Sequence, residues 1–326
     1  MKKFKIIALF LSFFIIITTV AGCTQKKNID EEVHLENTED ISNGVPEEHT
    51  GFPIEVEDDF GNVEIIEKAP TRIISLAPNN TEILFALGLG DKIVGVTSYC
   101  NYPEEATTKE IVGGFGQFNL EKIVELSPDL VIVYGAGNEE DNRVLRDAGI
   151  KILGFMPESV KDVKLTIEAI GQATGTLEEA VKIVSSMEEK ENEIVKKVEG
   201  QEKVRVFYEI WGDPLMGAGK GSFMDELITL AGGKNIAEDA DGAYFQYDIE
   251  QLIERDPDVY LASQGMEDMT VETIKSRPGY DGLTAVKNNR VYIFEGMDAD
   301  IVSRAGTRII EGLEIIAKAI HPELFK

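Results

Sequence analysis

SVKDVKLTIEAIGQATGTLEEAVKIVSSMEEKENEIVKKV, residues 159–198, is the stretch of this chain that decides its fold. Its apolar residues recur every three or four positions, which is the spacing of one helix face. Gly175 interrupts the pattern, and glycine often ends a helix because it adopts the left-handed conformation without strain. The stretch therefore predicts a helix, a turn and a second, long helix. On both sides of it, short β-rich runs alternate with helical ones, so we predict that it joins two α/β lobes.

The residues before this stretch, 52–158, are predicted to form the first lobe. They open with a hairpin pattern, because two alternating runs at 54–57 and 63–66 flank the turn-forming sequence DFGN. The helix that follows the first long β run is expected to be capped by Asn79 or Asn80. The alternation of strands with helices predicts a parallel sheet that is covered on both faces. The strands are expected at 72–76, 92–96, 129–134 and 150–153.

The same rhythm resumes after the helical linker, which we place at 159–199. A second lobe is predicted over 200–326, with strands at 204–208, 258–262 and 290–294. The predicted fold class is therefore α/β, with two Rossmann-like lobes joined by a single long backbone helix.

The N-terminus has the pattern of an export signal. Residues 1–5 are rich in lysine, and an almost unbroken apolar run follows over 6–20. The sequence VAGC at 20–23 resembles a bacterial lipobox, which implies cleavage before Cys23 and lipidation of its thiol. An uncleaved membrane anchor is the alternative, although a spanning helix needs roughly 20 apolar residues and this run is shorter. Both interpretations place the rest of the chain outside the cytoplasm, held at a membrane surface.

We predict residues 1–22 as the signal peptide and 23–51 as the lipidated cysteine with a disordered acidic tether, because few apolar residues occur there. The whole chain has a net charge of -27, from 59 acidic and 32 basic residues. This balance excludes nucleic-acid binding, which depends on neutralising phosphates. Cys100 is the other cysteine, and we expect it to be a small packed residue. If Cys23 carries lipid, the chain cannot form an internal disulfide.

One segment occurs twice. NLEKIVELSPDLV at 119–131 and DIEQLIERDPDVY at 248–260 share a capping residue, an early glutamate, apolar helix positions and then Pro-Asp before a strand. One explanation is that both are ordinary helix–turn–strand units. The other is that Glu121 and Glu250 occupy equivalent places on the two lobes and dock together onto a pseudo-symmetric partner. Each glutamate is expected in the first turn of a helix, where the helix dipole favours a negative charge.

The sequence offers no catalytic or metal-binding constellation. The three histidines are His34, His49 and His321, in the tether and at the tail, so neither a zinc or manganese site nor a Ser-His-Asp triad is indicated. The run GAGKGS at 217–222 fails the P-loop motif, because glycine follows the lysine where serine or threonine is required. We therefore expect a binding protein and not an enzyme, with no metal site and no cofactor.

Several stretches together resemble the substrate-binding proteins of ABC importers for vitamin B12 and ferric siderophores, which are class III periplasmic-binding-protein-like lipoproteins. The similarity runs from about Ala69 to the C-terminus, with the motifs in the family's order. The stretches are RIISLAPNNTE at 72–82, VGVTSYCNYP at 94–103, VGGF at 112–115 leading into NLE at 119–121, GGKNI at 232–236 and RAGTRI at 304–309.

This resemblance implies a ligand cleft between the two lobes and only small lobe movement. It also implies that one glutamate on each lobe pairs with arginines of a dimeric permease, and by motif these are Glu121 and Glu250. The implied partners are that permease with its ATPase subunits, the ligand, and the membrane through the lipid anchor on Cys23. We expect the protein itself to be a monomer.

Aromatic residues fall where strands are expected to end, which is where α/β folds place ligands. In the vitamin B12 proteins, aromatic residues at positions matching Tyr99, Phe115, Tyr134 and Tyr244 line the cleft. Arg304 is a candidate for holding an anionic group of a ligand, because guanidinium groups bind carboxylates well. Arg308, one helical turn further on, is expected to serve the structure. The predicted ligand-binding residues are Tyr99, Phe115, Tyr134, Trp211, Tyr244, Phe245 and Arg304.

We therefore predict a protein that captures a corrinoid and delivers it to an ABC importer. A ferric siderophore or haem is the alternative ligand, because tyrosine and phenylalanine stand here where tryptophan is common in the B12 proteins. Met216 likewise stands where an aromatic residue is often found. A more distant alternative is a tethered sensor or adhesion protein without a transport role.

Overall fold

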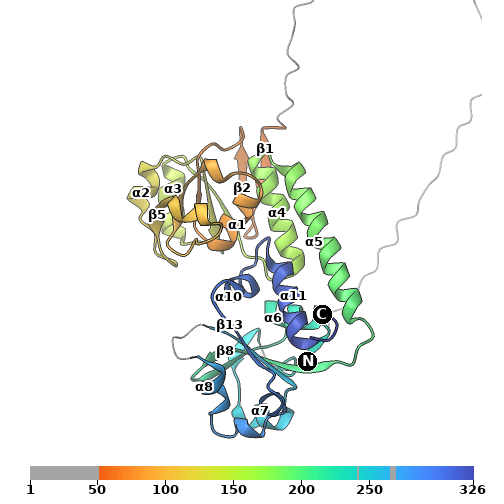
Figure 1. Ribbon diagram of the computed structural model, residues 1–326. Coiled ribbons are helices and arrows are strands. Elements are labelled where there is room, and N and C mark those ends of the chain that lie inside the picture. The colour runs from red at the N-terminus through yellow and green to blue at the C-terminus, as the bar shows by residue number, and fades with distance from the viewer. Residues whose placement is uncertain (1–50, 241, 265–268) are drawn as a thin grey trace, which may run out of the picture. The chain divides into compact units, whose positions relative to one another are not determined.

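The computed structural model describes residues 51–240, 242–264 and 269–326 (Figure 1). The predicted signal peptide, the lipidation of Cys23 and the acidic tether up to residue 50 lie outside these ranges. Among the helices within them, none has both the length and the apolar character that crossing a bilayer requires.

The helix, turn and long helix predicted from residues 159–198 are confirmed. Helix α4 spans Val160–Thr174, and the Ser159 hydroxyl caps it by accepting a hydrogen bond from the third helical N–H. Gly175 ends it in the left-handed conformation, with φ of 76°. Helix α5 then spans Leu177–Val198 and packs on α4 at one end and on the C-terminal helix α11, Ile309–Ile320, further along. In Figure 1 it runs beside both lobes, which makes it the backbone helix.

The first lobe contains a five-stranded, all-parallel sheet with strand order β5-β4-β3-β6-β7. The chain order reverses at β3, which has β4 on one side and β6 on the other. In such sheets, ligands bind beyond the carboxyl ends of the strands at this reversal. The elements are the hairpin β1 (Ile54–Glu57) and β2 (Val63–Ile66), strands β3 (Ile73–Ser75), β4 (Ile93–Thr97), β5 (Glu110–Gly113), β6 (Leu130–Tyr134) and β7 (Lys151–Phe155), helices α1 (Pro78–Ala86), α2 (Leu120–Glu125) and α3 (Glu139–Asp147), and the short 3-10 turns η1 (Gly90–Lys92) and η2 (Glu104–Thr108).

The second lobe has a mixed six-stranded sheet, built around β8. Strands β10, β12 and β13 are parallel to their neighbours, whereas β9 and β11 are antiparallel. Its elements are strands β8 (Val204–Gly212), β9 (Leu215–Ala218), β10 (Gly233–Asn235), β11 (Tyr244–Gln246), β12 (Val259–Ser263) and β13 (Val291–Phe294), helices α6 (Phe223–Leu230), α7 (Ile249–Arg255), α8 (Val271–Lys275), α9 (Thr284–Lys287), α10 (Gly296–Ser303) and α11, and the 3-10 turn η3 (Tyr280–Gly282).

The predicted α/β fold class with two lobes is confirmed, and one local prediction is wrong. Neither Asn79 nor Asn80 caps α1, because the helix begins at Pro78 with Ala77 as its N-cap and no capping side chain. Proline suits this first position, since its missing N–H would have had no partner within the helix. The sequence analysis made no prediction for the short strands β5, β9, β10 and β11, because their few residues show no clear strand pattern.

One cluster of buried apolar residues runs through both lobes. It includes Ile83 in α1, Met187 in α5 and Leu313 in α11, each at most 5% exposed. Burying a side chain of this size stabilises the fold by roughly 1.5–3 kcal/mol. Because the cluster is continuous, a large separation of the lobes would expose apolar surface, which favours small lobe movement.

Candidate functional site

The repeated segment forms the same structure in both lobes. Ser127 and Asp256, each just before the proline, adopt left-handed conformations with φ of 48° and 42°. The following aspartate then fastens the start of a neighbouring strand. Asp129 accepts the backbone N–H of Arg72 at 3.0 Å, and Asp258 accepts that of Arg205 at the same distance. The Pro-Asp part of the repeat is therefore explained by the fold.

The two glutamates of the repeat have no such structural use. Glu121 and Glu250 lie in the first turns of α2 and α7, whose starts are capped by the side chains of Asn119 and Asp248. Both glutamates are exposed, and neither forms an ion pair within the part of the chain that the structure describes. They are thus free to meet a basic partner.

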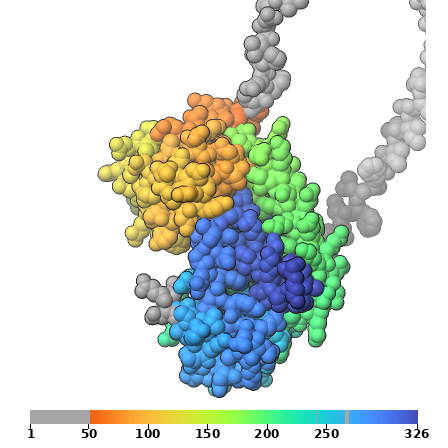
Figure 2. Space-filling view, viewed as in Figure 1, coloured from red at the N-terminus to blue at the C-terminus, as the bar shows by residue number. Residues whose placement is uncertain are grey.

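A pocket of about 580 Å³ lies at the carboxyl ends of β3, β4 and β6, where α1 begins. Its walls include Tyr99, Phe115 and Tyr134, whose exposed fractions are 57%, 86% and 46%. The segment that joins α10 to α11 closes one side of it with Arg304. The space-filling view shows the first lobe, in orange and yellow, meeting this blue region of the second lobe (Figure 2). Four of the predicted ligand-binding residues are therefore brought together.

Tyr244, on β11 of the second lobe, is 55% exposed and does not line this pocket. Burial raises the pKa of Tyr134, and the nearby Tyr244 and Glu158 raise it further. Burial likewise raises the pKa of Tyr244, with Glu158 contributing in the same direction. Tyr244 therefore acts electrostatically on Tyr134, and its role in binding remains a prediction.

Trp211 and Phe245 also lie outside the lining of this pocket. The Trp211 indole N–H donates a 2.8 Å hydrogen bond to the carbonyl of Asp213, and its ring is 41% exposed. Phe245 packs against the core, with its ring centroid 5.5 Å from that of Tyr247. A role for them in binding remains a prediction.

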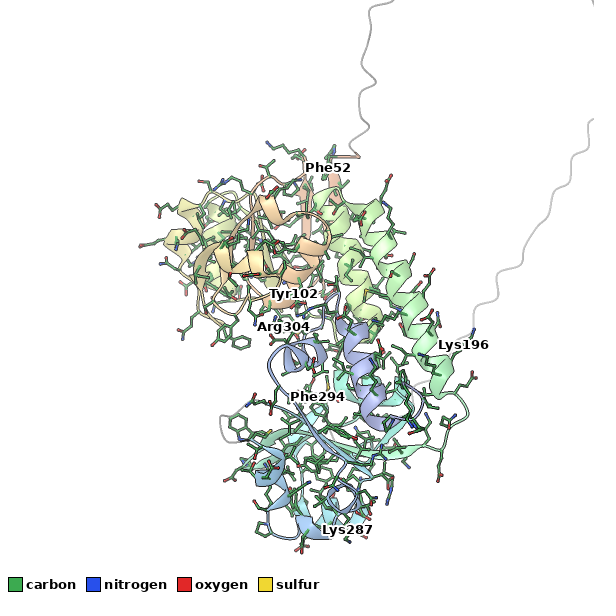
Figure 3. The ribbon with its side chains drawn as sticks, viewed as in Figure 1. Phe52, Tyr102, Lys196, Lys287, Phe294 and Arg304 are labelled. Carbon is green, nitrogen blue, oxygen red and sulfur yellow. The ribbon has the colours of Figure 1, made fainter. Side chains whose placement is uncertain are left out.

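Arg304 lines the pocket, but its positive charge is already compensated. Its guanidinium donates to Glu82 Oε1 at 2.8 Å and to Asn101 Oδ1 at 2.7 Å, and it pairs with Asp300 Oδ1 at 2.8 Å. Figure 3 shows Arg304 beside Tyr102, where the two lobes meet. An anionic ligand would have to compete with two carboxylates for this arginine.

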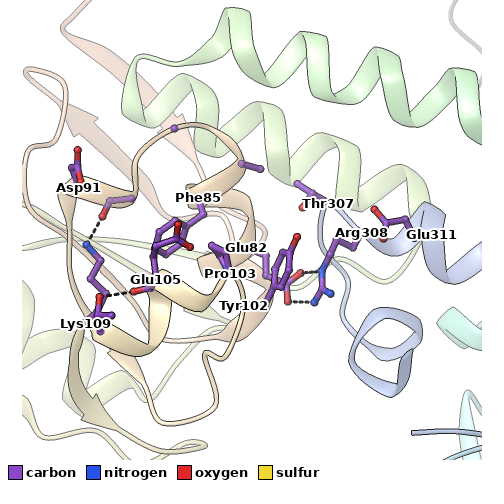
Figure 4. Close-up of a pocket in the computed structure, with 14 residues that line it drawn as sticks. Glu82, Phe85, Asp91, Tyr102, Pro103, Glu105, Lys109, Thr307, Arg308 and Glu311 are labelled. Carbon is purple, nitrogen blue, oxygen red and sulfur yellow. Dashed lines mark hydrogen bonds and ion pairs between the residues drawn. The ribbon is translucent and has the colours of Figure 1, made fainter. Parts of the chain in front are cut away.

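Arg308 serves the structure in the way that the sequence predicts. Its Nε and Nη2 donate to both carboxylate oxygens of Glu82, at 2.8 and 2.7 Å, and its guanidinium lies 3.8 Å from the centroid of the Tyr102 ring (Figure 4). Although burial acts to lower the pKa of Arg308, the hydrogen bonds and charge of Glu82 outweigh it and raise that pKa. Glu82 belongs to the first lobe and both arginines to the second, so this cluster fastens the lobes together.

Figure 4 also shows a second pocket, of about 780 Å³, on the other side of Glu82. Its walls carry charges of both signs, and several of them are already bonded. Lys109 donates to the carbonyl of Gly90 at 2.6 Å, and Arg308 is held by Glu82. It shares no lining residue with the aromatic pocket and offers a ligand fewer apolar rings. The aromatic pocket is therefore the better candidate site, although it is smaller.

Two further predictions concern cysteine and metals. Cys100 is 4% exposed, and its sulfur accepts a hydrogen bond from the Thr81 hydroxyl at 3.1 Å, which fits a packed residue. Across the described ranges, no group of three or more histidine, cysteine, aspartate or glutamate side chains is arranged to hold a metal ion.

The sequence analysis did not identify Glu82. The sequence does hold a hint of this ion pair. Glu82 stands among apolar residues of a predicted helix, and Arg304 and Arg308 stand four residues apart near the C-terminus. Pairing them required knowing that α1 and the start of α11 meet, across more than 200 positions.

Comparison with known proteins agrees with this architecture. The ABC transporter substrate-binding lipoprotein YvrC of Bacillus subtilis is 37% identical over 283 residues, covering 84% of this chain and 88% of the relative. The vitamin B12-binding protein of Vibrio cholerae is 32% identical over 244 residues, covering 74% of this chain and 86% of the relative.

Solved structures give the same result. A possible iron-binding, periplasmic solute-binding protein of Staphylococcus epidermidis matches with a TM-score of 0.69 and 32% identity, over 78% of this chain and 100% of the other. The periplasmic haem-binding protein RhuT of Roseiflexus matches with a TM-score of 0.69 and 26% identity, over 78% and 98%. The model of the periplasmic binding protein family matches residues 73–296. The chain therefore belongs to the periplasmic binding protein family.

Proposed function

We propose that this protein captures a corrinoid outside the cytoplasm and delivers it to an ABC importer. At the coarser level it is an ABC transporter substrate-binding protein of the vitamin B12, siderophore and haem type. The observation that carries the corrinoid assignment is the pocket walled by Tyr99, Phe115 and Tyr134. Rigid amphipathic rings suit a large, flat ligand that is partly apolar.

The protein is proposed to act by binding alone. Its family is one of solute-binding proteins, and its relatives include one described as a vitamin B12-binding protein. Export and lipidation at Cys23 would hold it at the outer side of the membrane, and the name of the Bacillus relative describes that protein as a lipoprotein.

Delivery is proposed to depend on Glu121 and Glu250. They are the exposed, unpaired residues of two structurally equivalent units, one in each lobe. A dimeric permease presents two equivalent surfaces, so a pair of acidic residues related in this way can engage both halves together. The acidic surface, with a net charge of -27, would also steer encounter with a basic partner.

A ferric siderophore or haem is the second candidate ligand. Two solved structures favour this ligand class. The chain is similar to a possible iron-binding protein and to a haem-binding protein, each with a TM-score of 0.69. The mechanism of capture and delivery would then be unchanged, and only the content of the aromatic pocket would differ.

Isothermal titration calorimetry on the purified full-length protein would test the assignment. Cyanocobalamin should bind saturably at one molecule per chain, and a panel of ferric siderophores and haem should bind more weakly. Tight binding of a siderophore or haem without corrinoid binding would replace the ligand. Binding of none of these compounds would reject the proposed function.

A further inference from the structure

We propose that the aromatic pocket excludes ligands with a net negative charge and accepts a ligand that has no net charge and offers amide groups; this inference rests on the proposed binding function. Of the described residues that line the pocket, Arg304 is the one with a formal charge. The others are apolar, aromatic, or carry neutral hydroxyl and amide groups, such as Thr97, Asn79 and Asn138.

The charge of Arg304 is not available to a ligand. Glu82 and Asp300 supply two negative charges to a cluster in which Arg304 and Arg308 supply two positive ones. The net charge of this cluster is therefore zero before any ligand enters. A ligand carboxylate that took over these hydrogen bonds of Arg304 would leave Glu82, whose side chain is 1% exposed, or Asp300 beside it as a second carboxylate. Like charges placed side by side in this way oppose binding.

The aromatic side of the pocket carries a negative field as well. Glu158 raises the pKa of both Tyr134 and Tyr244, which is the effect of a negative charge on the two phenols. The exposed Lys220, in the loop after β9, does not line the pocket. A second negative charge entering beside Tyr134 would meet this field, and the one cation among the described lining residues, Arg304, is already paired with two carboxylates.

Neutral polar groups find better partners. Helix α1 begins at the pocket without a side-chain cap, so its first N–H groups can donate to a carbonyl oxygen. The Asn79 amide donates only long hydrogen bonds, of 3.3 and 3.4 Å, which a ligand could replace. The hydroxyls of Tyr99 and Ser303 lie in the same lining. An amide offers both a donor and an acceptor to this set and brings no net charge.

A pair of matched ligands tests the inference. Cyanocobalamin has no net charge, because the positive cobalt–corrin centre balances its phosphodiester. Its monocarboxylic acid derivative differs by the conversion of one side-chain amide into a carboxylate, which adds one negative charge. The two would be titrated by calorimetry into the full-length protein at pH 7.5 and low ionic strength. We expect the acid to bind at least about tenfold more weakly, since one unscreened like charge within several ångströms has an effect of that order. Equal or tighter binding of the acid would show that the N-terminus of α1 attracts the carboxylate more strongly than the acidic groups repel it. This result would overturn the inference.

A second pair separates this inference from the ligand assignment. If neither corrinoid binds, the corrinoid function is wrong, and haem is compared with its dimethyl ester, in which both carboxylates are neutralised. Tighter binding of the ester would support the exclusion of anions, whereas tighter binding of haem itself would refute it. If neither pair binds, both proposals fail.

A matched pair of variants tests the role assigned to Arg304. Asp300→Asn removes one compensating charge but keeps an oxygen that can accept from Asn101, which donates to Asp300 at 2.9 Å. The ratio of the affinity for cyanocobalamin to the affinity for its monoacid should fall by about threefold or more in this variant. Asp298→Asn is the control, because this exposed residue lies on the same helix but forms no ion pair with Arg304. An unchanged affinity ratio in Asp300→Asn would overturn the inference.

Discussion

The buried contact between Glu82 and the two arginines gives the most direct test of how the lobes are held together. Glu82→Gln keeps the shape of the side chain but removes its charge and turns one acceptor into a donor. The carboxylate accepts three hydrogen bonds of 2.7–2.8 Å from Arg304 and Arg308. After substitution, Arg304 keeps Asp300 as a partner, whereas Arg308 loses its only carboxylate among the described contacts.

The expected magnitude follows from the burial of the groups. Breaking a buried ion pair by removing one partner costs about 3–5 kcal/mol. Because Arg304 remains paired and Arg308 still contacts the Tyr102 ring, we expect the lower end, about 3 kcal/mol. At about 2–4 °C per kcal/mol for a chain of this size, the melting temperature should fall by about 6–12 °C.

The assay is urea unfolding together with thermal melting, each followed by circular dichroism. Glu105→Gln is the matched control, because Glu105 lines the same second pocket but is exposed and forms no ion pair within the described residues. Its free energy of unfolding should change by no more than about 0.5 kcal/mol. A loss below about 1 kcal/mol in Glu82→Gln would refute the reasoning, since the arginines would then be solvated without it.

Three further predictions follow from other parts of the structure. Replacing both Glu121 and Glu250 by lysine should abolish uptake of labelled cyanocobalamin by cells, while the affinity of the protein for cyanocobalamin changes by less than about twofold. Each single variant serves as a comparison, and retained uptake in the double variant would contradict the docking role. Replacing both Tyr134 and Tyr244 by alanine should weaken cyanocobalamin binding by about a hundredfold, at about 1–1.5 kcal/mol for each ring, and unchanged affinity in calorimetry would remove them from the site. Hydrogen bonding to the neighbouring arginine lowers the pKa of Asp258, so its stabilising effect should be complete above the unfolded pKa of about 3.9 and lost as the pH falls through the lower folded value. Asp258→Asn should therefore lose about 1 kcal/mol in urea unfolding at pH 7, a small value because the pair is partly exposed, and the loss should vanish in strong acid; a loss that persists there would contradict the charge-based explanation.

The repeated segment shows how far reasoning from the sequence reaches. The spacing of glutamate, proline and aspartate predicted two equivalent units, and the left-handed residues before Pro128 and Pro257 confirm the equivalence. The sequence could not tell which acidic residues of the repeat serve the fold. The structure shows that Asp129 and Asp258 do, because each accepts a backbone N–H at the start of a neighbouring strand.

The sequence by itself determined the two-lobe α/β class, the long helix after Gly175 and the positions of the longer parallel strands. These features depend on contacts between residues that are close along the chain, where apolar periodicity and glycine report directly on backbone conformation. The short strands β9 and β11 were not predicted, because a short antiparallel strand is fixed by the strands it pairs with more than by its own few residues.

Only the tertiary structure decided what the charged residues at the lobe junction do. Arg304 has the chemistry of an anion-binding residue, and the sequence favoured that role. In the folded protein, a carboxylate from α1 reaches it across 222 positions and neutralises it together with Asp300. The physical reason is that the electrostatic effect of a charged side chain depends on the groups around it. Those groups are brought together by contacts between residues far apart in the sequence, which no local pattern records.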